Sequence, residues 1–207
     1  MSRLNPFSGL STRAIHGGPG PDPSTGAIVA PICQSTTYVQ QAVGVHKGHT
    51  YSRASNPTVS GLEQALGTLE DAPPSVCFAT GLAAETGLFL ALLKAGDHLI
   101  VSNVCYGGTV RLLRELLDGL GISATFLDTA TAASVASAIT PQTKLVFVET
   151  PGNPTLRLTD IAVIARACKA AGVKLAVDNT FLTPVIQRPL DLGADISLYS
   201  TTKYIEG

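Results

Sequence analysis

Residues 174–180, Lys-Leu-Ala-Val-Asp-Asn-Thr, decide the fold. Leu175–Val177 form a short apolar run that begins just after Gly172, the residue that ends a helical pattern over 161–171. An apolar run of this length after a helix is typical of a strand buried on both faces of a parallel sheet. A carboxylate at the end of such a strand, here Asp178, needs a cationic or hydrogen-bonding partner. We therefore expect a sheet with a polar site at its carboxyl edge.

The same alternation of short apolar runs and helix-length segments extends in both directions. Runs typical of strands lie at 76–79, 99–101, 124–127, 145–148 and 196–198. Helical patterns lie at 82–94, 109–120 and 161–171, and an earlier one begins at Asn56-Pro57, a good N-cap followed by a proline suited to the first helical position. The alternation predicts an α/β fold with a mainly parallel sheet sandwiched by helices.

The N-terminal residues differ from the rest of the chain. Residues 1–56 are rich in Pro and Gly, which prevent long helices, and little in them could form a core. Residues 1–60 hold four basic residues and one acidic residue, a net of +3, whereas 61–207 hold ten basic and fourteen acidic residues, a net of −4. We expect an extended arm over 1–56, a large domain over 57–207, and packing of the arm on a neighbouring subunit.

The composition narrows the class of protein. The chain has 207 residues, 45% of them apolar, with 14 Lys and Arg against 15 Asp and Glu. It has enough apolar material for a sizeable core, and it lacks the basic cluster typical of nucleic-acid binding. No apolar run approaches the roughly 18 residues of a bilayer span, and the first residues lack the apolar segment of a secretory signal. We expect a cytoplasmic protein that binds neither nucleic acid nor a membrane.

The cysteines and histidines give no sign of a metal site. The four cysteines form no Cys-x-x-Cys, which excludes a zinc ribbon or a thioredoxin-type motif. Cys77 and Cys168 lie in apolar runs and are expected to be buried free thiols. His46 and His49 have no further ligand cluster nearby, so we expect a solvated loop there.

Candidate site residues follow the predicted strands, because ligands of such sheets bind beyond the carboxyl ends of the strands. Gly81 opens a helix and would let backbone N–H groups approach an anion. Tyr106 precedes two glycines and could stack on a planar ligand. Asn153 lies in a loop made rigid by two prolines, which could point its amide inward. Taken alone, an ordinary turn or loop also explains each of these fragments.

The last apolar run leads into Tyr199-Ser200-Thr201-Thr202-Lys203-Tyr204. Lys203 is flanked by hydroxyls close behind a buried strand, and an amine that is buried there would have a lowered pKa and be nucleophilic enough to form a Schiff base. The hydroxyls of Ser200 and Thr202 could hold a phosphate. A surface lysine after an edge strand is the alternative interpretation.

Together these fragments predict one ligand, pyridoxal 5′-phosphate (PLP). It has a phosphate, a planar ring, a ring nitrogen that pairs with a carboxylate, and a carbonyl that reacts with lysine. Asp178 would keep the ring nitrogen protonated, and Lys203 would hold the aldehyde. A dinucleotide-binding domain, the alternative for such a sheet, would need a Gly-rich fingerprint that this sequence lacks.

The chain resembles the transsulfuration (Cys/Met metabolism) family of PLP enzymes, of fold type I. The matching stretches follow the family's order and reach from residue 51 to the end: Tyr51-Ser52-Arg53, Asn56-Pro57-Thr58, Ala79-Thr80-Gly81-Leu82, Cys105-Tyr106-Gly107-Gly108, Glu149-Thr150-Pro151-Gly152-Asn153-Pro154, Val177-Asp178-Asn179-Thr180-Phe181 and Ser200-Thr201-Thr202-Lys203-Tyr204.

The resemblance implies a role for each matching residue. It makes Lys203 the Schiff-base lysine and Asp178 the partner of the ring nitrogen. The remaining roles are phosphate binding for Gly81, Leu82, Ser200 and Thr202, ring stacking and acid/base assistance for Tyr106, contact with the ring hydroxyl for Asn153, and support of the Asp178 region for Thr180. It also implies that Tyr51 and Arg53 reach the phosphate of the adjacent subunit, so that the site is shared across a dimer, commonly within a tetramer.

Two departures from the family pattern stand out. Leu82 replaces a Met found in many members, a mild change because the backbone meets the phosphate. The chain also stops at Gly207, whereas relatives continue into a smaller C-terminal domain that supplies the arginine for the substrate carboxylate. We therefore expect an incomplete large domain without the small domain.

The implied activity is the making or breaking of C–S bonds in sulfur amino acids. Lys203 would abstract the α-proton, after which a leaving group departs from the side chain. Phe181 after Asp-Asn-Thr resembles cystathionine γ-synthases and γ-lyases more than β-lyases, which often have Trp there. Cystathionine β-lyase, a homoserine-ester sulfhydrylase and an inactive PLP-binding fragment are the alternatives.

Overall fold

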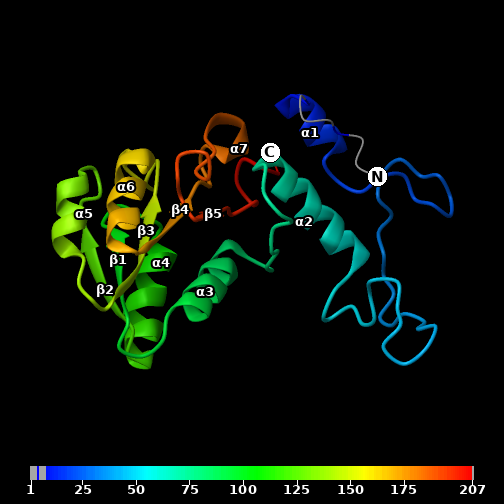
Figure 1. Cartoon of the computed structure of the whole chain (residues 1–207), viewed down its shortest axis with the longest axis horizontal. Coiled ribbons are helices and arrows are strands. Elements are labelled where there is room, and N and C mark those ends of the chain that lie inside the picture. The colour runs from blue at the N-terminus through cyan, green and yellow to red at the C-terminus, as the bar shows by residue number, and fades with distance from the viewer. Residues whose placement is uncertain (1–3, 5–7, 207) are drawn as a thin grey trace. The chain divides into compact units, whose positions relative to one another are not determined.

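The structure, a computed structural model, describes residue 4 and residues 8–206 (Figure 1). The chain divides into two compact units, 1–77 and 78–207. Residues 1–3, 5–7 and 207, which belong to the predicted arm and large domain, lie outside the described residues. The division into an arm over 1–56 and a large domain over 57–207 stays a prediction.

The unit of residues 78–207 is built on a parallel sheet, as predicted. Its strand order is β2-β1-β3-β4-β5, and each neighbouring pair is parallel. The strands are β1(His98–Ser102), β2(Ser123–Leu127), β3(Thr143–Glu149), β4(Lys174–Asp178) and β5(Ile196–Leu198). The register pairs Glu149 with Asp178 and Asp178 with Leu198, so the carboxyl ends of three strands meet at one edge of the sheet.

Helices cover both faces of this sheet, which explains why the middle residues of β1, β3 and β4 are apolar and buried, whereas the edge strand β2 is only partly covered. One face packs against α5(Ala132–Ala138) and α6(Ile161–Ala171), whose Val135, Ile164 and Cys168 are buried (Figure 1). The other face packs against α3(Gly81–Leu92) and the helical segment that follows β1. There the Phe89 ring meets the Phe147 ring edge to face, with centroids 5.2 Å apart.

Local sequence signals account for the helix ends. Thr80 caps α3 and Asp160 caps α6, each through a side-chain oxygen that accepts the backbone N–H of the third helical residue, Ala83 and Val163. The helical segments ending at 120 and 171 are followed by Gly121 and Gly172, both in the left-handed region that glycine adopts most readily.

The helical segment predicted over 109–120 is helical but not uniform. It consists of α4(Gly107–Arg111), a π-helix η1(Leu112–Leu117) and a 3₁₀ turn η2(Asp118–Leu120). The wider π turn buries Leu112, Leu113 and Leu117 together against the sheet, whereas Leu116 is half exposed. Burial of this cluster therefore accompanies the departure from regular α geometry.

The strand predicted at 76–79 is wrong. These residues have no ladder partner, and the Val76 side chain is 73% exposed. The backbone N–H of Cys77 donates to Glu63 Oε1 at 3.0 Å, so a side chain takes the hydrogen bond that a neighbouring strand would otherwise receive. The prediction that Cys77 is buried is also wrong, because this residue is only partly covered. Cys168 is buried as predicted.

The unit of residues 1–77 is mostly irregular. It contains α1(Leu10–His16), a helix within the predicted extended arm, and α2(Pro57–Leu69), which begins after Asn56 as predicted. The side chain of Asn56 accepts the backbone N–H of Thr58 at 2.9 Å. Several large apolar side chains between the two helices are strongly exposed: Ile28, Val29, Ile32, Val39 and Val43.

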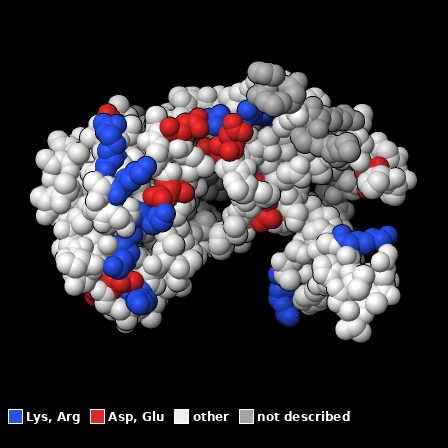
Figure 2. All heavy atoms as spheres, in the orientation of Figure 1, with Lys and Arg blue, Asp and Glu red and all other residues white. Residues whose placement is uncertain are grey.

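The surface carries charges of both signs. On the face of the 78–207 unit seen in Figure 2, acidic side chains lie among the basic ones. Among the described residues, no helix combines the length and the apolar character needed to cross a membrane. The same residues contain no group of three or more His, Cys, Asp and Glu placed to hold a metal ion.

Candidate functional site

A cavity of about 370 Å³ lies at the carboxyl edge of the sheet, entirely within the 78–207 unit. It is lined by Thr80, Gly81, Leu82, Glu85, Tyr106, Glu149, Asn153, Asp178, Thr180, Phe181, Leu198, Ser200, Thr202 and Lys203. Nine of the eleven residues predicted for the site line this one cavity. The other two, Tyr51 and Arg53, belong to the 1–77 unit, where the guanidinium of Arg53 lies 4.9 Å from the centroid of the Tyr51 ring.

Asp178 is the last residue of β4 and its side chain is buried. Its Oδ1 accepts hydrogen bonds from the backbone N–H and the hydroxyl of Thr180, at 2.9 Å and 2.5 Å. The Thr180 hydroxyl oxygen in turn accepts the N–H of Ser200 at 2.8 Å. Burial raises the pKa of Asp178, against the lowering effect of Thr180, and no cationic side chain among the described residues pairs with it. A buried carboxylate of this kind is suited to a cationic ligand group.

Two further buried carboxyl groups line the same cavity. Glu149 accepts the backbone N–H groups of Tyr106 and Asn153, and its pKa is raised to about 7 by burial and by the nearby Asp178. Glu85 accepts the Thr109 hydroxyl on Oε1 at 3.0 Å, whereas Oε2 is buried without a partner among the described residues. Burial raises the pKa of Glu85 to about 8, with Asp178 and Glu149 adding to the shift and Thr109 opposing it.

Gly81 begins α3 at the wall of the cavity. A Cβ atom there would lie 2.9 Å from Cβ of Ser200, so the close approach of the Ser200 loop requires glycine. The first N–H groups of a helix have no intrahelical acceptor, and the helix dipole favours an anion beside them. The backbone of Gly81 and Leu82 and the hydroxyls of Ser200 and Thr202 thus meet where a phosphate would bind.

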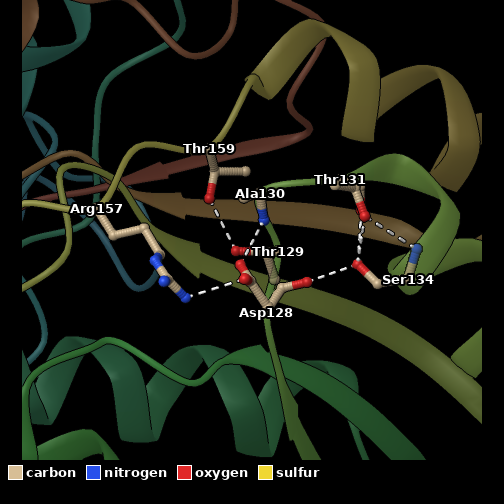
Figure 3. Close-up of polar contacts among 7 residues, drawn as sticks. All are labelled: Asp128, Thr129, Ala130, Thr131, Ser134, Arg157 and Thr159. Atoms are coloured by element: carbon tan, nitrogen blue, oxygen red, sulfur yellow. Dashed lines mark hydrogen bonds and ion pairs between the residues drawn. The ribbon is translucent and has the colours of Figure 1, made fainter.

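Tyr106 and Asn153 lie on loops that follow β1 and β3. A Cβ atom at Gly108 would lie 2.2 Å from Cε1 of the Tyr106 ring, so this glycine makes room for the ring. Figure 3 shows how the loop that carries Asn153 is attached at its far end: Arg157 forms an ion pair with Asp128 at 3.0 Å, and the hydroxyls of Thr159 and Thr129 lie 2.8 Å apart. The loop is therefore held at both ends.

Of the two interpretations of Lys203, the structure supports the exposed lysine and not the buried one. Lys203 lines the cavity and is exposed, in a run of turns over 201–206 that follows β5. The backbone N–H of Lys203 donates to the Ser200 carbonyl at 3.2 Å, so Lys203 lies in the same turn as the hydroxyls of Ser200 and Thr202.

Five lining residues are not among the site residues predicted from the sequence: Thr80, Glu85, Glu149, Phe181 and Leu198. Thr80, Glu149 and Phe181 lie in the family motifs, and Leu198 lies in a predicted strand. Glu85 had its own signal, since it is the only charged residue in the stretch Gly81–Leu92. A single carboxyl group in such an apolar helix indicates a carboxyl group that is buried and has a role there.

The residues of this cavity fit PLP. Asp178, which has no cationic partner among the described residues, suits a protonated ring nitrogen. The backbone at Gly81 and the hydroxyls beside it suit a phosphate, and the Lys203 amine lies at the same cavity. A parallel α/β sheet with these groups at its carboxyl edge defines the class of PLP enzymes of fold type I.

The sequence comparisons name the family. Residues 11–207 match the family described as Cys/Met metabolism PLP-dependent enzyme, and the chain belongs to this family. It is 49% identical to a probable cystathionine γ-synthase of Herpetosiphon aurantiacus, over 96% of this chain and 62% of that protein. It is 46% identical to the cystathionine γ-lyase of Bacillus subtilis, over 95% of this chain and 52% of that protein.

The solved structures agree with the fold. The crystal structure of metB from Corynebacterium glutamicum superposes with a TM-score of 0.95 at 45% identity, over 97% of this chain and 52% of that one. The cystathionine γ-lyase of Lactobacillus plantarum, complexed with L-serine, superposes with a TM-score of 0.93 at 43% identity, again over 97% and 52%. The chain thus spans about half to three fifths of the length of the relatives described here.

We expect Glu85 to make the stability of the cofactor-free protein depend on pH. Its pKa is about 8 in the folded protein against an ordinary 4.5, so the folded state binds more protons between these values. Its stabilising contribution is full below pH 4.5 and is lost as the pH rises toward 8. Urea unfolding should therefore show a smaller decrease in stability from pH 5 to 8 in Glu85→Gln than in the parent, by on the order of 1–3 kcal/mol. Identical pH profiles for Glu85→Gln and for the exposed control Glu115→Gln would contradict this expectation.

Proposed function

We propose that the protein is a PLP-dependent enzyme of sulfur amino-acid metabolism that makes or breaks C–S bonds by γ-replacement or γ-elimination. The observation that carries this proposal is the placement of the buried Asp178 carboxylate and the Lys203 amine at one cavity, with an anion cradle beside them. The relatives named cystathionine γ-synthase and γ-lyase support the type of chemistry.

Each side chain has a defined task in this proposal. PLP, when bound, supplies an electron sink that stabilises negative charge at the substrate α-carbon. Asp178 Oδ atoms hold the ring nitrogen protonated, and Thr180 keeps the carboxylate oriented through its two hydrogen bonds. Lys203 Nζ takes the proton from the substrate α-carbon and returns it later. Tyr106 packs on the ring and assists in proton transfer.

The phosphate and ring hydroxyl have their own partners. The N–H groups of Gly81 and Leu82 and the hydroxyls of Ser200 and Thr202 bind the phosphate. Asn153 contacts the ring hydroxyl from its anchored loop.

A second candidate activity is that of a β-lyase. A cystathionine β-lyase of Coxiella burnetii is 44% identical over 98% of this chain and 52% of that protein, nearly as similar as the γ-enzymes. Phe181, which lines the cavity, favours the γ-reactions over this candidate, because it resembles the residue of the γ-enzymes and not the Trp that β-lyases often have there. A sulfhydrylase acting on homoserine esters is the remaining candidate. Product analysis with cystathionine and with an activated homoserine separates these activities.

The test of the proposal is chemical trapping of the cofactor. Incubation with PLP, reduction with borohydride, proteolysis and mass spectrometry should locate a pyridoxyl group on Lys203 and not on the exposed control Lys169. A parent protein that takes up no PLP, or that carries the group elsewhere, contradicts the proposal and favours the dinucleotide-binding alternative. Labelled Lys203 without turnover of any sulfur amino acid indicates the inactive PLP-binding fragment.

We also propose a homo-oligomer with shared sites, most simply a dimer of dimers, acting in the cytoplasm. The strongly exposed apolar side chains of residues 28–43 would be covered by a second copy of the chain. Tyr51 and Arg53 would then reach the phosphate of the adjacent subunit. The four free cysteines suit a reducing compartment.

The shared site predicts complementation between two inactive variants. Arg53→Ala should weaken PLP retention by removing a planar guanidinium that can bind a phosphate through two N–H groups. Lys203→Ala removes the lysine on the other side of the interface. Mixing the two variants should create hybrid dimers in which one site has both wild-type residues, so part of the activity returns. Verified subunit exchange without any return of activity shows that Arg53 does not act in the adjacent subunit.

A further inference from the structure

Glu149 holds two loops of the site with one side chain. It is the last residue of β3, the central strand of the sheet, and only 5% of its surface is exposed. Its backbone N–H donates to Ser102 Oγ at 3.1 Å, which fixes the end of β3 to the end of β1. The backbone that carries the Glu149 side chain is therefore fixed in the sheet.

The two carboxylate oxygens accept from two different loops. Oε2 accepts the backbone N–H of Tyr106 at 2.6 Å, and Oε1 accepts the backbone N–H of Asn153 at 2.8 Å. Tyr106 belongs to the loop after β1 and Asn153 to the loop after β3. Both bonds use main-chain groups, so the side chains of Tyr106 and Asn153 stay available to a ligand of the cavity.

A carboxylate at the end of this side chain suits both bonds. An ionised carboxylate accepts on both oxygens, and N–H bonds to it are stronger than bonds to a neutral acceptor. Glutamine offers one acceptor and one N–H₂ donor, which would oppose one of the two loop N–H groups. Aspartate is shorter by one methylene group and cannot reach as far from the strand end. The bonds also explain why a buried carboxyl group persists beside Asp178 and Glu85.

We propose that Glu149 is a positioning residue, whose carboxylate holds the Tyr106 and Asn153 loops in the arrangement that binds PLP. This role rests on the proposed function, because Tyr106 and Asn153 are its ring-contacting residues. Glu149 acts through the two loops and needs no contact of its own with the reacting atoms.

The first measurement is hydrogen exchange of the two amides in the cofactor-free protein. In Glu149→Gln, at least one of the Tyr106 and Asn153 amides should exchange at least about tenfold faster than in the parent, because a charge-assisted hydrogen bond is lost. The exposed control Glu115→Gln removes the same charge and should leave both amides unchanged. Equal protection of both amides in all three proteins overturns the proposal.

The second measurement is PLP affinity, by titration of the cofactor-free protein and by visible circular dichroism of the bound cofactor. Glu149→Gln should raise the PLP dissociation constant about tenfold or more and change the dichroism band. In a Tyr106→Ala, Asn153→Ala background, the same substitution should add less than about twofold, because the groups it positions are gone. Equal effects in both backgrounds indicate a merely structural role and overturn the proposal.

A third variant covers the case in which Glu149→Gln does not fold. Glu149→Asp keeps the charge, and it should also release at least one of the two amides and weaken PLP binding. Weaker PLP binding in Glu149→Asp while both amides stay protected as in the parent overturns the proposal. A parent protein that binds no PLP overturns the proposed function, whereas a parent that binds PLP no more tightly than the Glu149 variants overturns only the role of Glu149.

Discussion

Lys203→Ala is expected to abolish the visible absorbance of lysine-bound cofactor and to reduce turnover by about 10³-fold or more, within the range that a positioned acid/base group contributes. The alanine has no amine to bind the cofactor covalently and none to take the α-proton. Absorbance spectra of the PLP-loaded protein and product formation from cystathionine measure the two losses separately.

Two further variants sharpen this result. Lys203→Arg retains the positive charge at the cavity but cannot form a Schiff base with the cofactor, so it should be almost as inactive as alanine. The exposed Lys169, on α6, provides the control, since Lys169→Ala should keep the parent rate. Parent-like turnover in Lys203→Ala would show that another residue moves the proton.

Asp178→Asn should slow exchange of the substrate α-proton in deuterated solvent on the order of 10²-fold, while PLP occupancy falls much less. The amide keeps the shape of the side chain and still accepts hydrogen bonds from Thr180, but it carries no charge to favour a protonated ring nitrogen. Proton exchange followed by NMR reports on the electron sink, and absorbance reports on occupancy.

The exposed Asp118 offers a matched control for this substitution. Asp118→Asn also removes one negative charge but lies outside the cavity, so its exchange rate should equal that of the parent. An unchanged exchange rate in Asp178→Asn, with PLP bound, would remove Asp178 from its proposed role. A loss of PLP as large as the loss of exchange would instead indicate a role in binding alone.

Periodicity was sufficient to predict most of the sheet. The runs at 99–101, 124–127, 145–148, 175–177 and 196–198 all lie within strands, and the runs in β1, β3 and β4 are apolar because both faces of these strands are buried. The run at 76–79 has the same composition but pairs with nothing. A strand forms only where a neighbouring strand pairs with its backbone groups. Composition does not reveal whether such a strand or the Glu63 side chain takes the backbone hydrogen bond.

The candidate site divides in the same way. Residues at strand ends, such as Asp178, could be predicted from sequence because parallel strands bring their carboxyl ends to one edge. The sequence left open whether Lys203 is buried or exposed, since burial depends on which segments cover a turn and not on the residues within it. Glu85 was missed because its partners Thr109, Asp178 and Glu149 are distant along the chain.

The sequence by itself determined the α/β alternation, the helix caps at Asn56 and Gly172, and the residue types that a PLP site needs, since each depends on local backbone preference or on side-chain chemistry. Only the tertiary structure decided that Glu149 joins two loops, and that Gly81 is required by the approach of Ser200 rather than by an anion alone. Both depend on distances between segments far apart in the chain. Such distances are set by packing of the whole sheet and its helices, which no local pattern encodes.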